Sequence, residues 1–130
     1  QHQIGNHSFE HGFNFDWKTT AAMQAEIGQT NDVIFNVTGQ QCTFFRPPYG
    51  VTNPNLAKAI KQSNMKSIGW SIRSLDTVAK DETKLIDRIL KKAHSGGIIL
   101  LHDSVEITVK ILPKLIEQLR QKGYEFVKIV

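Results

Sequence analysis

The feature that most constrains the fold is an alternation of short apolar runs with amphipathic segments of helical period. The strand candidates are 42–45, 66–72, 98–101 and 124–130, and helix candidates lie between them. Such alternation is typical of parallel β-α units, because two parallel strands need a crossover that a helix supplies. A closed eight-stranded β/α barrel needs about 250 residues, and this chain has 130. The pattern therefore predicts an α/β fold, either a small open sheet or part of a barrel.

The expected helices are bounded by capping residues. They cover about 19–37, 53–64, 83 to the two glycines at 96 and 97, and 105–121. Gly39 and Gly123 follow the first and last of them, as is typical of helix ends. Asn53 is a good cap, and Pro54 suits the first turn. Pro113 is expected to kink the last helix or divide it in two.

Composition excludes several classes of protein. With 40% hydrophobic and 22% charged residues, the chain is typical of a globular domain and not of a disordered or collagen-like one. The longest apolar run, 98–101, is too short to span a bilayer. The lone Cys42 cannot form an internal disulfide and is interpreted as a small core residue, so cysteine usage does not indicate the compartment.

The chain is moderately basic, and its lysines and arginines are dispersed along the sequence. The formal net charge is +4 and the pI is about 9.3. The densest basic group, Arg88, Lys91 and Lys92, fits the solvent face and C-terminal end of a helix. A nucleic-acid interface requires a clustered basic patch, so we expect no nucleic-acid partner.

Two histidines four residues apart, His7 and His11, are the first chemical signal. On one helical turn this spacing directs both side chains to the same side, where two neutral imidazole nitrogens can share a metal ion. The alternative is a solvated surface pair. The sequence offers no cysteine pair and no third histidine at ligand spacing to complete a structural zinc site.

A rigid turn follows the strand candidate 42–45. In Arg46-Pro47-Pro48-Tyr49-Gly50 the prolines preset the backbone and the glycine permits a sharp turn. In parallel β/α folds the carboxyl ends of the strands carry the ligand site. The segment is therefore either part of a site or a structural turn with a surface arginine.

His102 and Asp76 also follow strand candidates, 98–101 and 66–72. A histidine at a strand end lies where general acids and bases are placed, and a carboxylate can orient an imidazole and favour its protonated form. The alternatives are a histidine that bonds to the next loop and an aspartate that caps the next helix.

Together, the segments 3–11, 46–50, 70–76 and 100–103 occur in an order that resembles the polysaccharide deacetylase family. This family is the NodB-homology domain, or carbohydrate esterase family 4, and the resemblance covers nearly the whole chain. It implies a distorted TIM-like (β/α) barrel, of which the chain would hold only the later strands and helices. The implied reaction is hydrolysis of an N- or O-linked acetyl group on a polysaccharide or amino-sugar polymer.

The resemblance also implies the metal and the acid. His7 and His11 would bind a divalent metal, most often zinc. His102 would be the general acid that protonates the leaving amine, and Asp76 would be its charge partner. Metal polarisation of the carbonyl and a positioned acid are physically sensible parts of such a mechanism.

Further residues gain roles by the same resemblance. Arg46 would orient the catalytic carboxylate, and the backbone N–H of Tyr49 would stabilise the oxyanion. Tyr49, Leu100 and Pro47 would contact substrate, with Leu100 lining the pocket for the acetyl methyl group.

The family's first motif, Thr-Phe-Asp-Asp-Gly, does not occur here, although it supplies the catalytic base and the third metal ligand. The chain begins with Gln and only six residues before His7, so we expect 1–130 to be a single, N-terminally truncated deacetylase domain. By itself it is expected to bind metal weakly and to have little activity. Gly12 replaces a frequent proline, and Thr77 replaces a frequent tryptophan.

The resemblance leads to expectations about the longer protein. It would act outside the cytoplasm or in the cell envelope on an acetylated carbohydrate polymer. A fragment with open sheet edges is also expected to associate with itself. The competing hypothesis is a non-catalytic carbohydrate-binding or assembly domain with a degenerate deacetylase fold.

Overall fold

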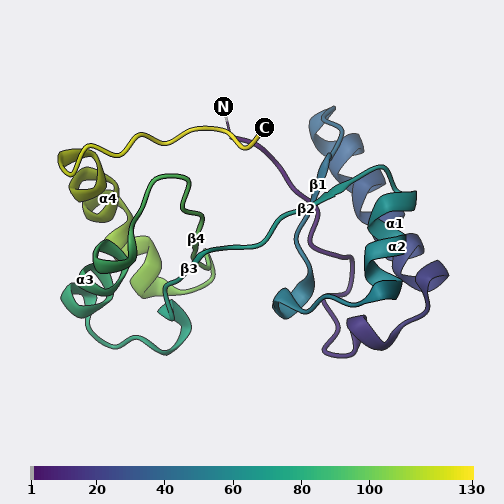
Figure 1. Ribbon diagram of the computed structural model, residues 1–130, viewed down its shortest axis with the longest axis horizontal. Coiled ribbons are helices and arrows are strands. Elements are labelled where there is room, and N and C mark those ends of the chain that lie inside the picture. Colours follow the sequence, from purple (N-terminus) through teal and green to yellow (C-terminus); the bar gives the residue numbers. More distant parts are fainter. Residues whose placement is uncertain (1) are drawn as a thin grey trace. The chain divides into compact units, whose positions relative to one another are not determined.

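A computed structural model describes residues 2–130. The chain divides into two compact units, one ending at Gly69 and the other beginning at Trp70. Each unit has its own two-stranded parallel sheet and its own pair of α-helices (Figure 1). The expected combination of helices with parallel strands is therefore confirmed.

The first unit combines two helices with a short sheet. Its elements are the 3₁₀-helix η1 (Phe15–Trp17), α1 (Thr20–Thr38), β1 (Phe44–Phe45), the 3₁₀-helix η2 (Pro48–Gly50), α2 (Pro54–Gln62) and β2 (Lys66–Ser67). In the sheet, Phe44 lies opposite Lys66 and Phe45 opposite Ser67. Asn6 forms a parallel bridge with Phe45. The segment before His7 is thereby fixed beside β1.

Local caps explain the limits of these helices. The Thr19 side chain accepts a hydrogen bond from the first turn of α1, and Gly39 ends that helix with a left-handed φ of 68°. Asn53 caps α2 in the same way, and Pro54 is its first residue. These caps confirm both expected helix starts and the glycine stop.

The core of the first unit lies between α1, α2 and the sheet. Its buried members are Phe15, Met23, Ile27, Phe45, Leu56, Ala59, Ile60 and Met65. Cys42 packs against this cluster while partly exposed, close to the expected role, and burial raises the pKa of its thiol.

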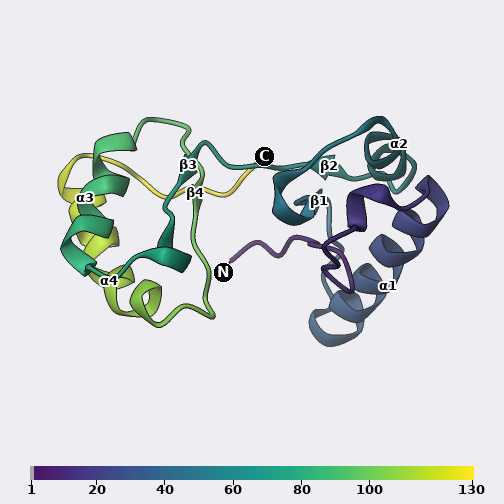
Figure 2. The same cartoon turned by 90° about the horizontal axis from the view of Figure 1, so that it is seen from below.

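The second unit also combines a two-stranded parallel sheet with two α-helices, but its elements follow one another in a different order. Its elements are β3 (Ile72–Arg73), the 3₁₀-helix η3 (Asp76–Val78), α3 (Glu82–Lys92), β4 (Ile99–Leu100) and α4 (Glu106–Gln121). Ile72 pairs with Ile99 and Arg73 with Leu100. Helices α3 and α4 lie side by side in both views (Figure 1 and Figure 2). Their core comprises Ile72, Leu85, Ile86, Ile89, Ile111, Leu115 and Leu119.

The strand predictions were too long. The run 66–72 is two strands, because β2 pairs with β1 and β3 pairs with β4, and Gly69 lies between them. The run 98–101 contains only β4, which is half-buried and not covered on both faces. The run 42–45 is reduced to β1. Residues 124–130 are not a strand, because no strand among residues 2–130 pairs with them and most of them are exposed.

Two helix boundaries differ from expectation. Helix α3 begins after Asp81, whose side chain accepts from the amide of Lys84, and it ends at Lys92, where Ala93 becomes extended before the glycines. Of the two effects expected of Pro113, a kink or a division, the division is wrong, because α4 runs through Pro113 as one helix. Packing of its apolar face against α3 offsets the lost hydrogen bond.

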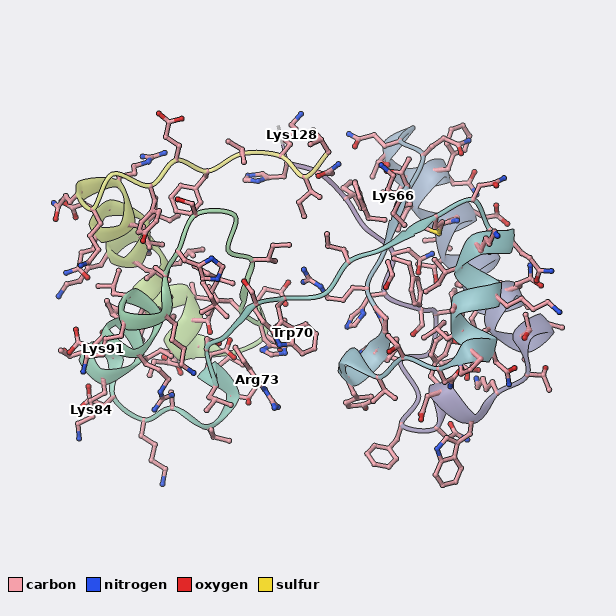
Figure 3. All side chains as sticks on the ribbon, viewed as in Figure 1. Lys66, Trp70, Arg73, Lys84, Lys91 and Lys128 are labelled. Atoms are coloured by element: carbon pink, nitrogen blue, oxygen red, sulfur yellow. The ribbon has the colours of Figure 1, made fainter. Side chains whose placement is uncertain are left out.

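The basic group at the end of α3 lies on its surface. Lys91 and Lys92 are exposed, while the half-buried Arg88 donates to the carbonyl of Ser74 at 3.1 Å. Lys84 and Lys91 point outward from α3 (Figure 3). No helix within residues 2–130 is long and apolar enough to cross a membrane.

Candidate active site

The segment that carries the histidine pair is a tight turn and not the helical turn that the spacing suggested. Ser8 and His11 both have left-handed backbones, with φ of 68° and 51°. The turn is closed by its own side chains: the amide of Ser8 donates to Asn6 Oδ1 at 2.9 Å, and the amide of His11 donates to Ser8 Oγ at 3.0 Å. Polar side chains that bond locally in this way compete with helix formation.

The turn still brings both imidazoles together. His7 Nε2 and His11 Nε2 are 3.1 Å apart, and the rings meet edge to face. His7 Nδ1 lies 2.6 Å from the carbonyl oxygen of Arg46. Because a carbonyl oxygen only accepts, Nδ1 carries the hydrogen and the Nε2 of the neutral ring is an acceptor.

This donor arrangement fits a divalent metal. Two nitrogen ligands of a tetrahedral zinc ion, each at about 2.0–2.1 Å, lie about 3.4 Å apart, close to the separation of His7 Nε2 and His11 Nε2. A backbone carbonyl bonded to the other ring nitrogen is the usual support for a histidine ligand. Among residues 2–130, no group of three or more His, Cys, Asp or Glu side chains is arranged to hold a metal. The pair therefore offers two candidate ligands.

The Arg46–Gly50 turn lies against the histidines. Pro47 and Pro48 are buried, and Tyr49 and Gly50 have left-handed φ values of 56° and 72°. The exposed Tyr49 ring meets the ring of His11 edge to face, with 4.9 Å between centroids. The turn is thus both a rigid structural element and a neighbour of the candidate metal ligands.

Arg46 has an incomplete set of partners. One terminal nitrogen, Nη2, donates to the carbonyl of Gly69 at 3.3 Å. Its Nε is buried and has no hydrogen-bond partner among residues 2–130. Burial lowers the pKa of the guanidinium, which still stays charged at neutral pH. An unpaired buried donor is costly, so this N–H is suited to an acceptor that residues 2–130 do not provide.

In the second unit, Asp76 and His102 form the pair that the sequence suggested. His102 Nδ1 lies 2.9 Å from Asp76 Oδ1, and the backbone N–H of His102 donates to Oδ2 at 2.7 Å. The carboxylate also accepts from the Thr77 amide at 3.0 Å and from Thr108 Oγ1 at 2.7 Å. Each oxygen of this buried group therefore accepts two hydrogen bonds.

These bonds determine the ionisation of Asp76 and the tautomer of His102. Burial by itself raises the pKa of Asp76, but hydrogen bonds from Thr108 and His102 outweigh it and hold that pKa below its usual value. The ionised carboxylate accepts from Nδ1–H, so His102 presents Nε2 at its other edge. The imidazole side chain is 43% exposed, so this edge can reach a ligand.

The structure places the remaining predicted residues without testing their roles. Leu100 is half-buried in β4, beside Arg73 of β3. Pro47 begins the turn before Tyr49. The contact of either residue with substrate stays a prediction.

Three residues around these groups were missed. Thr108, in the first turn of α4, bonds to Asp76, and its position shortly after His102 was a usable signal. Phe13 meets Tyr49 edge to face while 85% exposed. Glu26 is a buried carboxylate beside the core residues of α1, and a charge within an apolar helical stripe is the signal that could have found it.

Comparison with known proteins identifies the family. Residues 1–68, just over half of the chain, match the family model described as polysaccharide deacetylase. The chain belongs to the polysaccharide deacetylase family. The recognition from the four segments is therefore confirmed.

Relatives of this chain include enzymes and a pseudoenzyme. Peptidoglycan-N-acetylmuramic acid deacetylase PdaA of Bacillus subtilis is 33% identical over 98% of the chain and 50% of PdaA. A Streptomyces lividans family 4 carbohydrate esterase, solved with acetate, has a TM-score of 0.91 at 26% identity, over 98% of the chain and 66% of its own. A Bacillus anthracis family 4 pseudoenzyme has a TM-score of 0.87 at 28% identity, over 94% and 43%.

These likenesses confirm the predicted fold class, part of the α/β fold of the deacetylase family. The chain spans half the length of PdaA and two thirds or less of the two solved structures.

Proposed function

We propose that the chain is part of a metal-dependent hydrolase that removes N- or O-linked acetyl groups from a carbohydrate polymer. The observation that carries the proposal is the convergence of His7 Nε2 and His11 Nε2 at 3.1 Å, with the His7 ring oriented by the carbonyl of Arg46. PdaA, named as a peptidoglycan deacetylase, supports an acetylated cell-wall polymer as the substrate class. Such a substrate lies outside the cytoplasm, which is the location we propose.

The histidine pair fits zinc, and we propose His7 and His11 as two of its ligands. When bound, zinc would supply Lewis acidity to the acetyl carbonyl and to the attacking water. The third protein ligand would come from a carboxylate outside residues 2–130. The unpaired Nε–H of Arg46 supports a nearby role for such a carboxylate, because a charged acceptor would complete the guanidinium's hydrogen bonds.

His102 would act as the general acid. The carboxylate of Asp76 holds the hydrogen on His102 Nδ1, so a proton carried on Nε2 would be the one transferred to the leaving nitrogen or oxygen. The Tyr49 N–H would donate to the developing oxyanion. Leu100 and Pro47 would contact the acyl group and the adjoining substrate.

A non-catalytic domain is the second candidate. One observation favours it, the likeness to the Bacillus anthracis pseudoenzyme. Such a domain would bind the polymer and release no acetate.

Acetate release distinguishes the two candidates. We would compare this chain with the full-length protein from its source on an acetylated chitooligosaccharide, with added zinc or cobalt. We expect metal-dependent release by the full-length protein, loss of release in its His7→Ala variant, and little turnover by the chain alone. Polymer binding without any release by the full-length protein would support the non-catalytic domain instead.

A further inference from the structure

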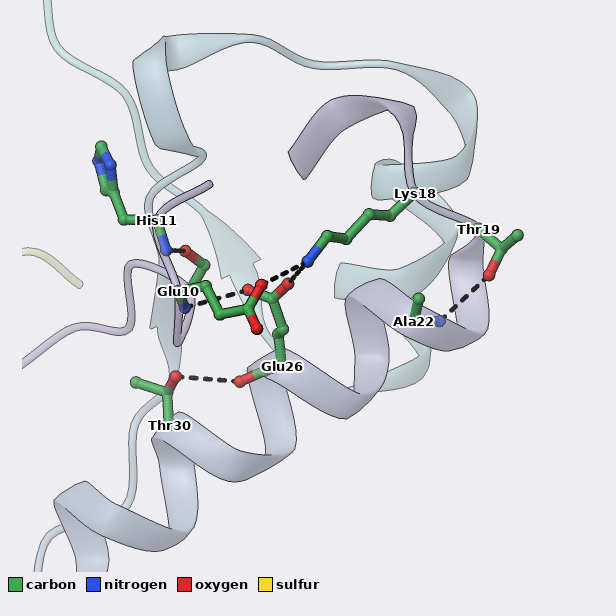
Figure 4. Close-up of polar contacts among 8 residues, drawn as sticks. Glu10, His11, Lys18, Thr19, Ala22, Glu26 and Thr30 are labelled. Atoms are coloured by element: carbon green, nitrogen blue, oxygen red, sulfur yellow. Dashed lines mark hydrogen bonds and ion pairs between the residues drawn. The ribbon is translucent and has the colours of Figure 1, made fainter. Parts of the chain in front are cut away.

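Glu26 is a buried carboxylate whose partners lie beside the histidine turn. It is 6% exposed and lies on α1 next to the core residue Ile27. A buried charge is retained only when it is paired and hydrogen-bonded. Its Oε1 forms an ion pair with Lys18 Nζ, and its Oε2 accepts from the backbone amide of Glu10 at 3.3 Å. Both oxygens are therefore occupied by the segment that flanks His11 (Figure 4).

Lys18 strengthens the same connection. Its Nζ lies between two carboxylates, pairing with Glu26 and, at 2.9 Å, with Glu10 Oε2 (Figure 4). Glu10 is thus held at its backbone and at its side chain. Because Glu10 directly precedes His11, this contact fixes the end of the turn that carries the second imidazole.

The other end of the turn is attached to the same helix. Asn6 Nδ2 donates to the carbonyl of Ile27 at 2.9 Å and to Asn31 Oδ1 at 2.7 Å. Helix α1 therefore holds the turn at Asn6 and at Glu10, on either side of the left-handed Ser8. A backbone of this kind is disfavoured for residues with a side chain and persists only where surrounding contacts determine it.

We propose that Glu26, acting with Lys18, is a positioning residue for the metal-binding histidine pair. It holds the turn at Glu10 and so sets the approach of His11 Nε2 to His7 Nε2. This proposal rests on the proposed function, in which the two histidines bind the metal. A merely structural Glu26 would stabilise α1 and leave the separation of the two rings unchanged.

Glu26→Gln is the decisive variant because it keeps the shape and helix propensity of the side chain. The two donors meet different oxygens of Glu26, Lys18 at Oε1 and the Glu10 amide at Oε2. A glutamine has an oxygen at only one of these positions and an NH₂ group, which cannot accept, at the other. The matched control is Glu106→Gln, which breaks the exposed Glu106–Lys110 pair at 2.7 Å and removes the same charge. Lys18→Met and Lys18→Arg form a second set, since arginine can still bridge two carboxylates.

The first measurement needs no metal. In the metal-free chain, we expect a ring-to-ring nuclear Overhauser effect between His7 and His11, whose centroids are 4.7 Å apart. It should be lost in Glu26→Gln and Lys18→Met and retained in Lys18→Arg and Glu106→Gln. Its retention in both Glu26→Gln and Lys18→Met would overturn the proposal. If Glu26→Gln does not fold, the comparison of Lys18→Met with Lys18→Arg decides the question.

The second measurement is zinc affinity by competition with a chromophoric chelator. Loss of supporting contacts around ligands typically costs 10- to 100-fold in metal affinity, and we expect about tenfold weaker binding for Glu26→Gln. Glu106→Gln should bind as the unaltered chain does. Equal affinity of Glu26→Gln and the unaltered chain would contradict the positioning role. Equal affinity of His7→Ala and the unaltered chain would instead refute the metal site of the proposed function, and the ring contact would still decide the role of Glu26.

Discussion

Asp76→Asn tests whether the buried carboxylate in the second unit is ionised and fully bonded. In the native chain Asp76 accepts from two backbone amides, one imidazole and one hydroxyl. An asparagine has one acceptor oxygen, and its amide group must replace the other. If the amide replaces Oδ2 it meets the His102 N–H, and if it replaces Oδ1 it meets the Thr77 N–H. Either orientation leaves a backbone donor without its acceptor.

The magnitude follows from these bonds. An unsatisfied buried donor costs about 1–3 kcal/mol, and hydrogen bonds to a charged group contribute about 1.5–3 kcal/mol each before competing terms. We expect Asp76→Asn to lower the free energy of unfolding by about 2–4 kcal/mol at pH 7. The exposed Asp87 of α3 provides the control, because Asp87→Asn should change the free energy of unfolding by less than about 0.5 kcal/mol. Urea unfolding followed by circular dichroism measures both.

The pH dependence has a definite sign. The pKa of Asp76 in the folded chain lies below its usual value, and the unfolded value is about 3.9. The ionised carboxylate therefore contributes stability that is fully present above the unfolded pKa and is lost as the pH falls through the folded pKa. The difference between the native chain and Asp76→Asn should shrink between pH 5 and pH 2. A difference that stays constant over this range would refute an ionised Asp76.

Three further predictions concern single contacts. Thr108→Val removes the hydroxyl that donates to Asp76 and should lower the free energy of unfolding by about 1–2 kcal/mol, whereas Thr108→Ser keeps the hydroxyl and should lower it by much less. Urea titration measures both variants, and equal losses would show that the hydroxyl does not contribute. Asn53→Ala removes the cap of α2 and should cost about 1 kcal/mol in the same assay, while an unchanged midpoint would contradict the cap's contribution. In the full-length protein, His102→Ala should lower the rate of acetate release by about 100-fold or more, and an unchanged rate would remove His102 as the general acid.

Helix starts could be predicted because their causes are local. Thr19 and Asn53 bond to amides within the next few residues, and this is information that a sequence window contains. Strands depend on partners elsewhere in the chain. The run 124–130 alternates in the sequence, but no strand among residues 2–130 pairs with it. Helix α4 continues through Pro113 because its packing against α3, which is not local, outweighs the propensity of proline.

The sequence indicated that His7 and His11, and likewise Asp76 and His102, act together, but it did not indicate the geometry that brings each pair into contact. The spacing of His7 and His11 indicated a shared side, yet the rings converge through a turn with left-handed residues that α1 holds from outside. The spacing of the two histidines in the sequence cannot predict these contacts between α1 and the turn. Asp76 and His102 are far apart in the chain, and only the pairing of β3 with β4 explains why their strand ends meet. The position of α4 then brings Thr108 within hydrogen-bond distance of Asp76.

The two units differ in how complete their chemistry is. Within residues 70–130, the Asp76 carboxylate has all its acceptor positions used by His102, Thr77 and Thr108, so this acid pair needs no further group to be oriented. In residues 2–69, the two histidines that we propose as metal ligands converge without a third candidate ligand, and Arg46 Nε has no hydrogen-bond acceptor. A carboxylate can serve both as a zinc ligand and as a hydrogen-bond acceptor for a guanidinium. One added segment that carries carboxylates would therefore complete the proposed metal site and the hydrogen bonds of Arg46. Supplying that segment should therefore raise zinc affinity while leaving the contribution of Asp76 to stability unchanged.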